Sequence, residues 1–180
     1  MTTKLLVFNS TPLIYLTRVS LVNLFTEIRE EKITTSKVYH EVIIQGKKME
    51  SPEAVLLEKL FKQKTIAIRE PKDKEFMKML VRIAADRERQ PLHEAEAEVL
   101  SVAKEVNGVA IVDDKIARSV ALLLGIELHG TGYVLGKMYL TGKIGKEKLK
   151  QKVKEMRNQG WFLSGEDYLG VMGYLETLKS

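Results

Sequence analysis

The chain has 180 residues, no cysteine and a formal net charge of +5. The lack of cysteine excludes disulfides, thiolate zinc sites and cysteine nucleophiles, and the length suits one well-buried domain. The first apolar run is too short for a secretory signal and no apolar stretch approaches about 20 residues, so we expect a soluble, cytoplasmic protein. Lys and Glu make up 40 of the 53 charged residues, which weakly indicates a thermophilic source.

Short apolar runs alternate with amphipathic segments along the chain. The runs that predict strands are residues 5–8, 33–35, 66–68, 109–112 and 126–129. The segments that predict helices are residues 13–19, 36–45, 52–63, 73–89, 93–106, 115–124, 132–140, 146–158 and 166–178. Thr11 is expected to cap the first helix, with Pro12 at its first position. Strands that alternate with helices indicate an α/β fold of three layers, α/β/α, around a central and mostly parallel sheet.

Three glutamates alternate at the start of the predicted helix 93–106. Its apolar stripe is formed by Ala95, Val99, Val102 and Val106. Glu94 and Glu98 flank one side of this stripe, and Glu96 flanks the other. Any of the three could be a solvated surface charge, and Glu94, which opens the helix, is our candidate for a site.

Two of the five aspartates, Asp113 and Asp114, follow the apolar run 109–112 directly. Ligands collect at the carboxyl ends of parallel strands, and carboxylates there need solvent, cations or a metal. Their oxygens suit Mg²⁺ or Mn²⁺. The plainer interpretation is that the pair caps the following helix.

Three further polar residues occupy comparable places. Asn9 follows the first strand, Glu41 lies in the helix after the second strand, and Glu94 opens the helix before the aspartate-tipped strand. In a doubly wound sheet these residues could converge on one crevice. Several carboxylates around a divalent ion supply what phosphodiester hydrolysis needs. Alternatively, Asn9 satisfies backbone groups in a turn and Glu41 is a surface charge.

Four stretches resemble the motifs of PIN-domain nucleases, in order and at plausible spacing. They are residues 8–14, 38–42, 94–97 and 111–118. The fourth is the most specific, because a prokaryotic toxin-like branch shows a similar tandem-Asp-x-x-Ala-Arg stretch. The resemblance spans about residues 5–140 and implies a PIN-like, Rossmann-like domain over residues 1–180, with a basic helical extension at 141–180 packed on it.

The resemblance implies metal-ligand roles for Glu41, Glu94 and Asp114, with Mg²⁺ or Mn²⁺ as the cofactor. Asp113 would be a ligand or a close neighbour, and Ser10 would position water or phosphate. Asn9 stands where the family usually has aspartate, so the site loses one negative ligand.

Two functions are open on this basis. The first is a metal-dependent ribonuclease, resembling the toxin of a toxin–antitoxin pair, with RNA, a small antitoxin and a second copy of the chain as implied partners. The second is a PIN-like module that binds RNA or protein and cuts weakly or not at all. A phosphoacceptor receiver domain fits poorly, because its tandem acids follow the first strand, where this chain has Asn9.

The positive charge is concentrated near the C-terminus. Residues 141–158 hold seven basic and two acidic side chains, a net charge equal to that of the whole chain. A polyanion would be attracted to this segment, although a solvated helix face has the same pattern. The residues expected to contact nucleic acid are Lys115, Arg118, Lys143, Lys146, Lys150 and Lys154. Trp161 and Phe162 are expected to pack this helix rather than stack on bases.

Overall fold

Five short strands form one sheet in which every pairing is parallel. The structure is a computed structural model that describes residues 4–161 and 164–178, so Phe162 lies outside the described residues. The strands are β1 (Leu6–Phe8), β2 (Lys32–Thr34), β3 (Ile66–Ile68), β4 (Val109–Ile111) and β5 (Leu128–His129). Their order across the sheet is β3-β2-β1-β4-β5. The predicted strands and their parallel arrangement are confirmed.

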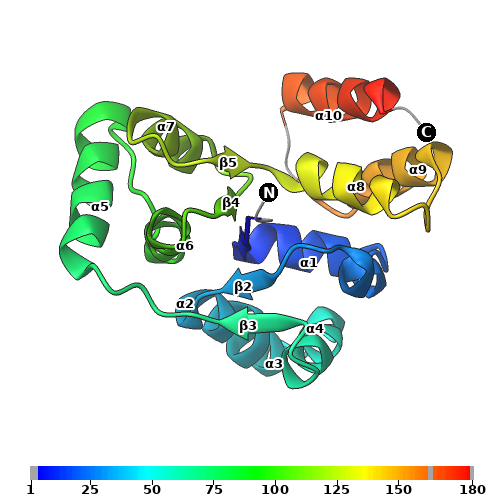
Figure 1. The fold of residues 1–180 in the computed structure, drawn as a ribbon, viewed down its shortest axis with the longest axis horizontal. Helices are drawn as coiled ribbons and strands as arrows, with labels where there is room; N and C mark the ends of the chain where they lie inside the picture. Colours follow the sequence, from blue (N-terminus) through cyan, green and yellow to red (C-terminus); the bar gives the residue numbers. More distant parts are fainter. Residues whose placement is uncertain (1–3, 162–163, 179–180) are drawn as a thin grey trace.

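Helices cover both faces of this sheet (Figure 1). On one side lie α5 (Lys74–Glu88), α6 (Glu94–Glu105) and α7 (Lys115–Leu123). On the other lie α1 (Ser10–Arg18), α8 (Thr131–Leu140) and α9 (Lys146–Asn158). The remaining helices are the 3₁₀ helix η1 (Val22–Glu27), α2 (Ser36–Tyr39), the π-helix η2 (His40–Gln45), α3 (Gly46–Lys48), α4 (Pro52–Lys62) and α10 (Gly165–Thr177). The predicted three-layer α/β/α architecture is therefore confirmed.

The two central strands are buried along their whole length. All residues of β1 and β4 are at most 2% exposed. This burial explains their unbroken apolar sequences, because helices cover both faces of a parallel sheet. Phe8, the last residue of β1, packs its ring against Phe25 of η1 with 5.2 Å between the ring centroids.

The first helix begins earlier than the sequence predicts. α1 starts at Ser10, so Asn9, rather than Thr11, takes the position that precedes the helix. Pro12 is then the third residue of α1, still within the first turn, where backbone N–H groups have no partner in the helix. This shift places Asn9 and Ser10 at the junction between strand and helix.

The predicted helix 36–45 consists of α2 followed by the π-helix η2. The Thr35 hydroxyl caps α2 by accepting the N–H of Val38 at 3.4 Å. A π-helical turn holds one extra residue per hydrogen-bonded ring and is frequent at functional sites. Glu41 lies in the first turn of η2.

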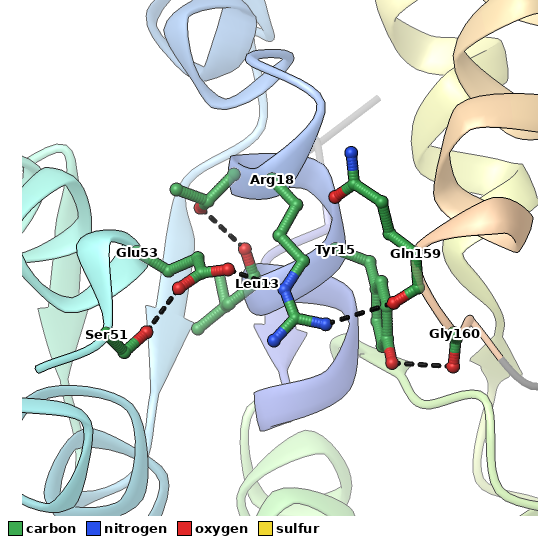
Figure 2. Close-up of polar contacts among 8 residues, drawn as sticks. Leu13, Tyr15, Arg18, Ser51, Glu53, Gln159 and Gly160 are labelled. Carbon is green, nitrogen blue, oxygen red and sulfur yellow. Dashed lines mark hydrogen bonds and ion pairs between the residues drawn. The ribbon is translucent and has the colours of Figure 1, made fainter. Parts of the chain in front are cut away.

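The C-terminal end of α9 is attached to α1 (Figure 2). The Tyr15 hydroxyl donates to the carbonyl of Gly160 at 2.7 Å, and Arg18 donates to the carbonyl of Gln159 at 3.3 Å. Leu149, Val153 and Met156 of α9 are fully buried. None of the described helices is long and apolar enough to cross a membrane.

Candidate active site

The carboxyl ends of β1 and β4 bring the first polar residues of the site together. Phe8 and Ile111 are partners in the parallel register, and the backbone N–H of Asn9 donates to the carbonyl of Ile111 at 3.0 Å. Asn9 and the residues after β4 therefore share one edge of the sheet. The strand order reverses between β1 and β4, and in doubly wound sheets this is where ligands bind.

Glu41 is joined to this edge by Ser10. The Ser10 hydroxyl donates to Oε2 of Glu41, which connects the first turn of α1 to η2. Nearby, the Thr34 hydroxyl donates to the carbonyl of Phe8 at 2.7 Å and holds the end of β2 against the end of β1. Ser10 was expected to position water or phosphate. In the structure its hydroxyl contacts Glu41 and positions that side chain.

Glu96 is the buried carboxylate of the site. Its side chain lies in the first turn of α6, where Oε2 accepts the N–H of His93 at 3.0 Å. Burial, together with the negative charges of Asp114 and Glu41, raises the pKa of Glu96 to about 7, against the lowering effect of the His93 N–H that it accepts. This coupling indicates that the three carboxylates share one region of negative charge.

Glu94 and Glu98 lie on the other side of α6. Glu94 is 68% exposed and forms an ion pair with Lys37, while Glu98 accepts the backbone N–H of Lys37 at 3.3 Å. Both glutamates therefore hold α2 against α6. The structure places Glu96, rather than the expected Glu94, among the other acids. The signal for this was present in the sequence, because Glu96 flanks the apolar stripe on the side opposite Glu94.

The two adjacent aspartates have different contacts. Asp114 caps α7, since its carboxylate accepts the N–H of Ala117 at 2.8 Å. Asp113 accepts the N–H and the hydroxyl of Thr131, both at 2.7 Å, and the indole N–H of Trp161 at 3.0 Å. Both oxygens of Asp113 are thus engaged in holding the end of β4 to the start of α8 and to Trp161.

The donor set of this edge has the chemistry of a site for a hard divalent ion. Asn9 Oδ1 is buried and has no hydrogen-bond partner among the described residues, an arrangement that is costly for a polar atom. Together with Glu41, Glu96 and Asp114 it offers oxygen ligands, as Mg²⁺ and Mn²⁺ prefer. In the described part of the chain, however, no three acidic or histidine side chains already stand close enough to hold a metal ion. The side chains would have to converge on the ion.

The candidate nucleic-acid-binding cations lie in two places. Lys115 and Arg118, on the first turn of α7, line a pocket beside Asp113, and Lys115 Nζ is 3.6 Å from Asp167.

On α9, Lys150 is 15% exposed and pairs with Glu147 and Glu176, and Lys146 donates to the carbonyl of Glu176 at 3.0 Å. The exposed cations of the basic segment include Lys143 and Lys154. Acidic partners therefore neutralise part of the charge of α9.

A family model described as a PIN domain matches residues 5–176. The chain belongs to the PIN-domain family. The predicted membership of the PIN-domain family is thereby confirmed, and the match extends through α9 and most of α10. PIN domains are generally nucleases, which places this chain in a nuclease superfamily. No curated protein matched the chain.

Proposed function

We propose that this PIN domain is a divalent-metal-dependent ribonuclease whose site is formed by Asn9, Glu41, Glu96 and Asp114. The observation that carries the proposal is the burial of Glu96 among the charges of Asp114 and Glu41. The partnerless Asn9 Oδ1 at the same edge of the sheet supports it. A divalent cation offsets the mutual repulsion of such carboxylates, and it promotes phosphodiester hydrolysis by activating water and by offsetting charge on the phosphate.

Each residue has a distinct part in this proposal. Glu41, Glu96 and Asp114 would hold the ion, with Asn9 as a neutral ligand, and Ser10 and Asp113 would position Glu41 and the end of β4. A bound Mg²⁺ or Mn²⁺ supplies an activated water and offsets charge on the scissile phosphate. Glu96 replaces Glu94 of the original expectation as the ligand from α6. The expected products carry a 5′-phosphate and a 3′-hydroxyl.

The biological setting follows from the resemblance to the toxin-like branch. In that setting the protein is a cytoplasmic toxin that pairs with a small antitoxin and forms a homodimer. Support for this part of the proposal comes from the tandem-Asp-x-x-Ala-Arg stretch at residues 113–118 alone.

The test is cleavage of a panel of structured RNAs in the presence of Mn²⁺, Mg²⁺ or EDTA. Asp114→Asn and Glu96→Gln are expected to abolish metal-dependent cleavage, whereas Glu94→Gln is the matched control on the same helix and is expected to cut like the parent. Asparagine is as good a helix cap as aspartate, so Asp114→Asn keeps the start of α7. Loss of cleavage in Glu94→Gln with full cleavage in Glu96→Gln would overturn the assignment.

A second function, binding without cleavage, is favoured by Asn9 itself. An amide offers an oxygen but no charge, so the site has one negative ligand fewer than the family usually has. Retention of RNA by the parent protein without metal-dependent cleavage would establish this second function. Asn9→Asp is the informative variant in that case, because a gain of cleavage would show that the missing charge is the cause.

A further inference from the structure

A pocket of about 670 Å³ lies beside the candidate active site and shares Asp113 with its edge of the sheet. Its walls come from the start of α7, from the turn between β5 and α8, and from α10. In Figure 1, α10 lies alongside α8, apart from the sheet. The proposed metal ligands do not line this pocket. It is therefore a feature that the proposed reaction leaves unexplained.

Aromatic rings form one side of the pocket. The rings of His129 and Tyr133 are stacked, with 4.3 Å between centroids and 9° between planes. Tyr174 and Val171 of α10 add further apolar surface. A stacked pair of flat rings beside an apolar wall is a surface on which another flat ring can stack.

Charges of both signs line the pocket near Asp113. Lys115 and Arg118 supply cations, and the Lys115 side chain is 74% exposed. Glu166 and Asp167, at the start of α10, supply carboxylates. The Ser164 hydroxyl, which donates to Asp167, lowers the pKa of this carboxyl, and the nearby cations Lys115 and Arg118 add to the effect, so Asp167 is ionised at neutral pH. The pocket therefore offers cations that can contact a phosphate and carboxylates that can accept hydrogen bonds. Inorganic phosphate could use only the cations.

Glycine at position 130 lets the charged groups approach the pocket wall. A Cβ atom there would lie 2.7 Å from Asp113 Oδ1 and 3.5 Å from Nη2 of Arg118. At Gly132, a Cβ atom would lie 3.0 Å from Cγ2 of Val171. Side chains at these positions would separate α7, α8 and α10, so the two glycines keep the three walls close enough to contact one ligand.

We propose that this pocket binds one unpaired nucleotide of the RNA substrate, next to the phosphodiester bond that is cut. The base stacks on the His129–Tyr133 pair, Lys115 and Arg118 contact its phosphate, and the carboxylates of Glu166 and Asp167 accept hydrogens from amino or hydroxyl groups. The inference rests on the proposed function, because Lys115 directly follows the ligand Asp114.

The test uses Trp161, the only tryptophan of the chain, which lines the pocket. The protein in EDTA is titrated with adenosine 5′-monophosphate, with uridine 5′-monophosphate and with inorganic phosphate. Binding is followed by tryptophan fluorescence and by calorimetry. Saturable binding of a nucleotide is expected, with inorganic phosphate at least about tenfold weaker because it cannot stack.

Variants locate the binding. His129→Ala is expected to weaken nucleotide binding about tenfold, and His129→Phe, which keeps a flat ring, to restore it. Lys115→Gln is expected to weaken binding, while Lys72→Gln, an exposed cation outside the pocket, is the matched control. A short single-stranded oligoribonucleotide that competes with the monophosphate would assign the site to RNA. Failure to compete would assign it to a free nucleotide and overturn the proposal.

The two proposals fail in different ways. Asp114→Asn should lose cleavage and keep nucleotide binding. If the parent does not cut RNA but binds the monophosphate, the proposed function fails alone. If the parent cuts RNA while neither fluorescence nor calorimetry detects a nucleotide, or His129→Ala binds it unchanged, the pocket assignment fails alone.

Discussion

The indole N–H of Trp161 donates to the carboxylate of Asp113 at 3.0 Å, which joins the segment after α9 directly to the end of β4. Thr131 donates to the same carboxylate twice. Side chains of consecutive residues in extended chain point to opposite sides, so Asp113 and Asp114 face different surroundings. Asp113 therefore stabilises the fold, whereas Asp114 is available to the proposed active site.

Asp113→Ala is expected to destabilise the protein. The change leaves the N–H groups of Thr131 and Trp161 without their acceptor, at a cost of about 3 kcal/mol, or roughly 10 °C in Tm. Thermal unfolding of this variant and of Asp86→Ala, an exposed aspartate on α5, measures the difference. Equal melting temperatures for the two variants would contradict the structural role of Asp113.

The buried Glu96 predicts how the stability of the metal-free protein depends on pH. Its pKa is raised from 4.5 to about 7, so between these values the folded protein holds a proton that the unfolded chain has lost. The free energy of unfolding should therefore fall as pH rises from about 4.5 to 7, by about 3 kcal/mol at most. Glu96→Gln should remove this fall.

Urea denaturation in EDTA at pH 5, 6, 7 and 8 measures this effect. Glu96→Gln is expected to gain stability over the parent as pH rises, whereas Glu94→Gln, largely exposed on the same helix, is expected to follow the parent. A parallel pH dependence of the parent and Glu96→Gln would show that Glu96 is not buried as described.

Asn9→Asp is expected to strengthen the binding of Mn²⁺. The change adds a negative charge beside Glu41, Glu96 and Asp114, and Coulomb attraction to a divalent ion at contact distance strengthens binding about tenfold or more. Calorimetric titration of the EDTA-treated protein checks this, with Asn23→Asp, at an exposed position of η1, as the control. Equal gains in the two variants would mean that net charge, rather than the site, attracts the ion.

Gly108→Ala is expected to destabilise the entry into β4. A Cβ atom at Gly108 would lie 2.8 Å from the carbonyl oxygen of Leu5, which accepts the N–H of Val109 in the sheet. Because the atom in the way belongs to the backbone and cannot move aside easily, we expect the free energy of unfolding to fall by about 2 kcal/mol. Gly173→Ala, in open space on α10, should gain about 0.5–1 kcal/mol. Chemical denaturation of both variants gives the comparison, and a stable Gly108→Ala would contradict the close approach.

The sequence predicts the elements well because their signals are local. Apolar runs mark the five strands, and the position of Asn9 and Asp114 after two of them places both residues at the sheet edge. Glu41 is placed by the same logic, since it belongs to the helix that follows β2. What the local pattern misses is the π-helical turn that carries Glu41, since a period of 3.6 residues describes an ordinary helix equally well.

The parts that sequence alone does not predict depend on contacts between distant segments. The choice between Glu94 and Glu96 is decided by the docking of α2, where Lys37 pairs with Glu94 and leaves Glu96 inside. Glu176 of α10 likewise neutralises Lys150 of α9, so the charge of the basic segment is smaller in the fold than in the sequence. Neither partner lies within one helical turn of the residue it affects.

The order of the strands also bears on the synthesis of the protein. The four proposed site residues lie at positions 9, 41, 96 and 114, and β1 pairs with β4 only after the helices between β2 and β4 have been made. A chain that leaves the ribosome from its N-terminus can thus assemble Ser10 with Glu41 early, but not the complete acidic group. The proposed site is therefore incomplete until Asp114 and the strand before it have emerged from the ribosome.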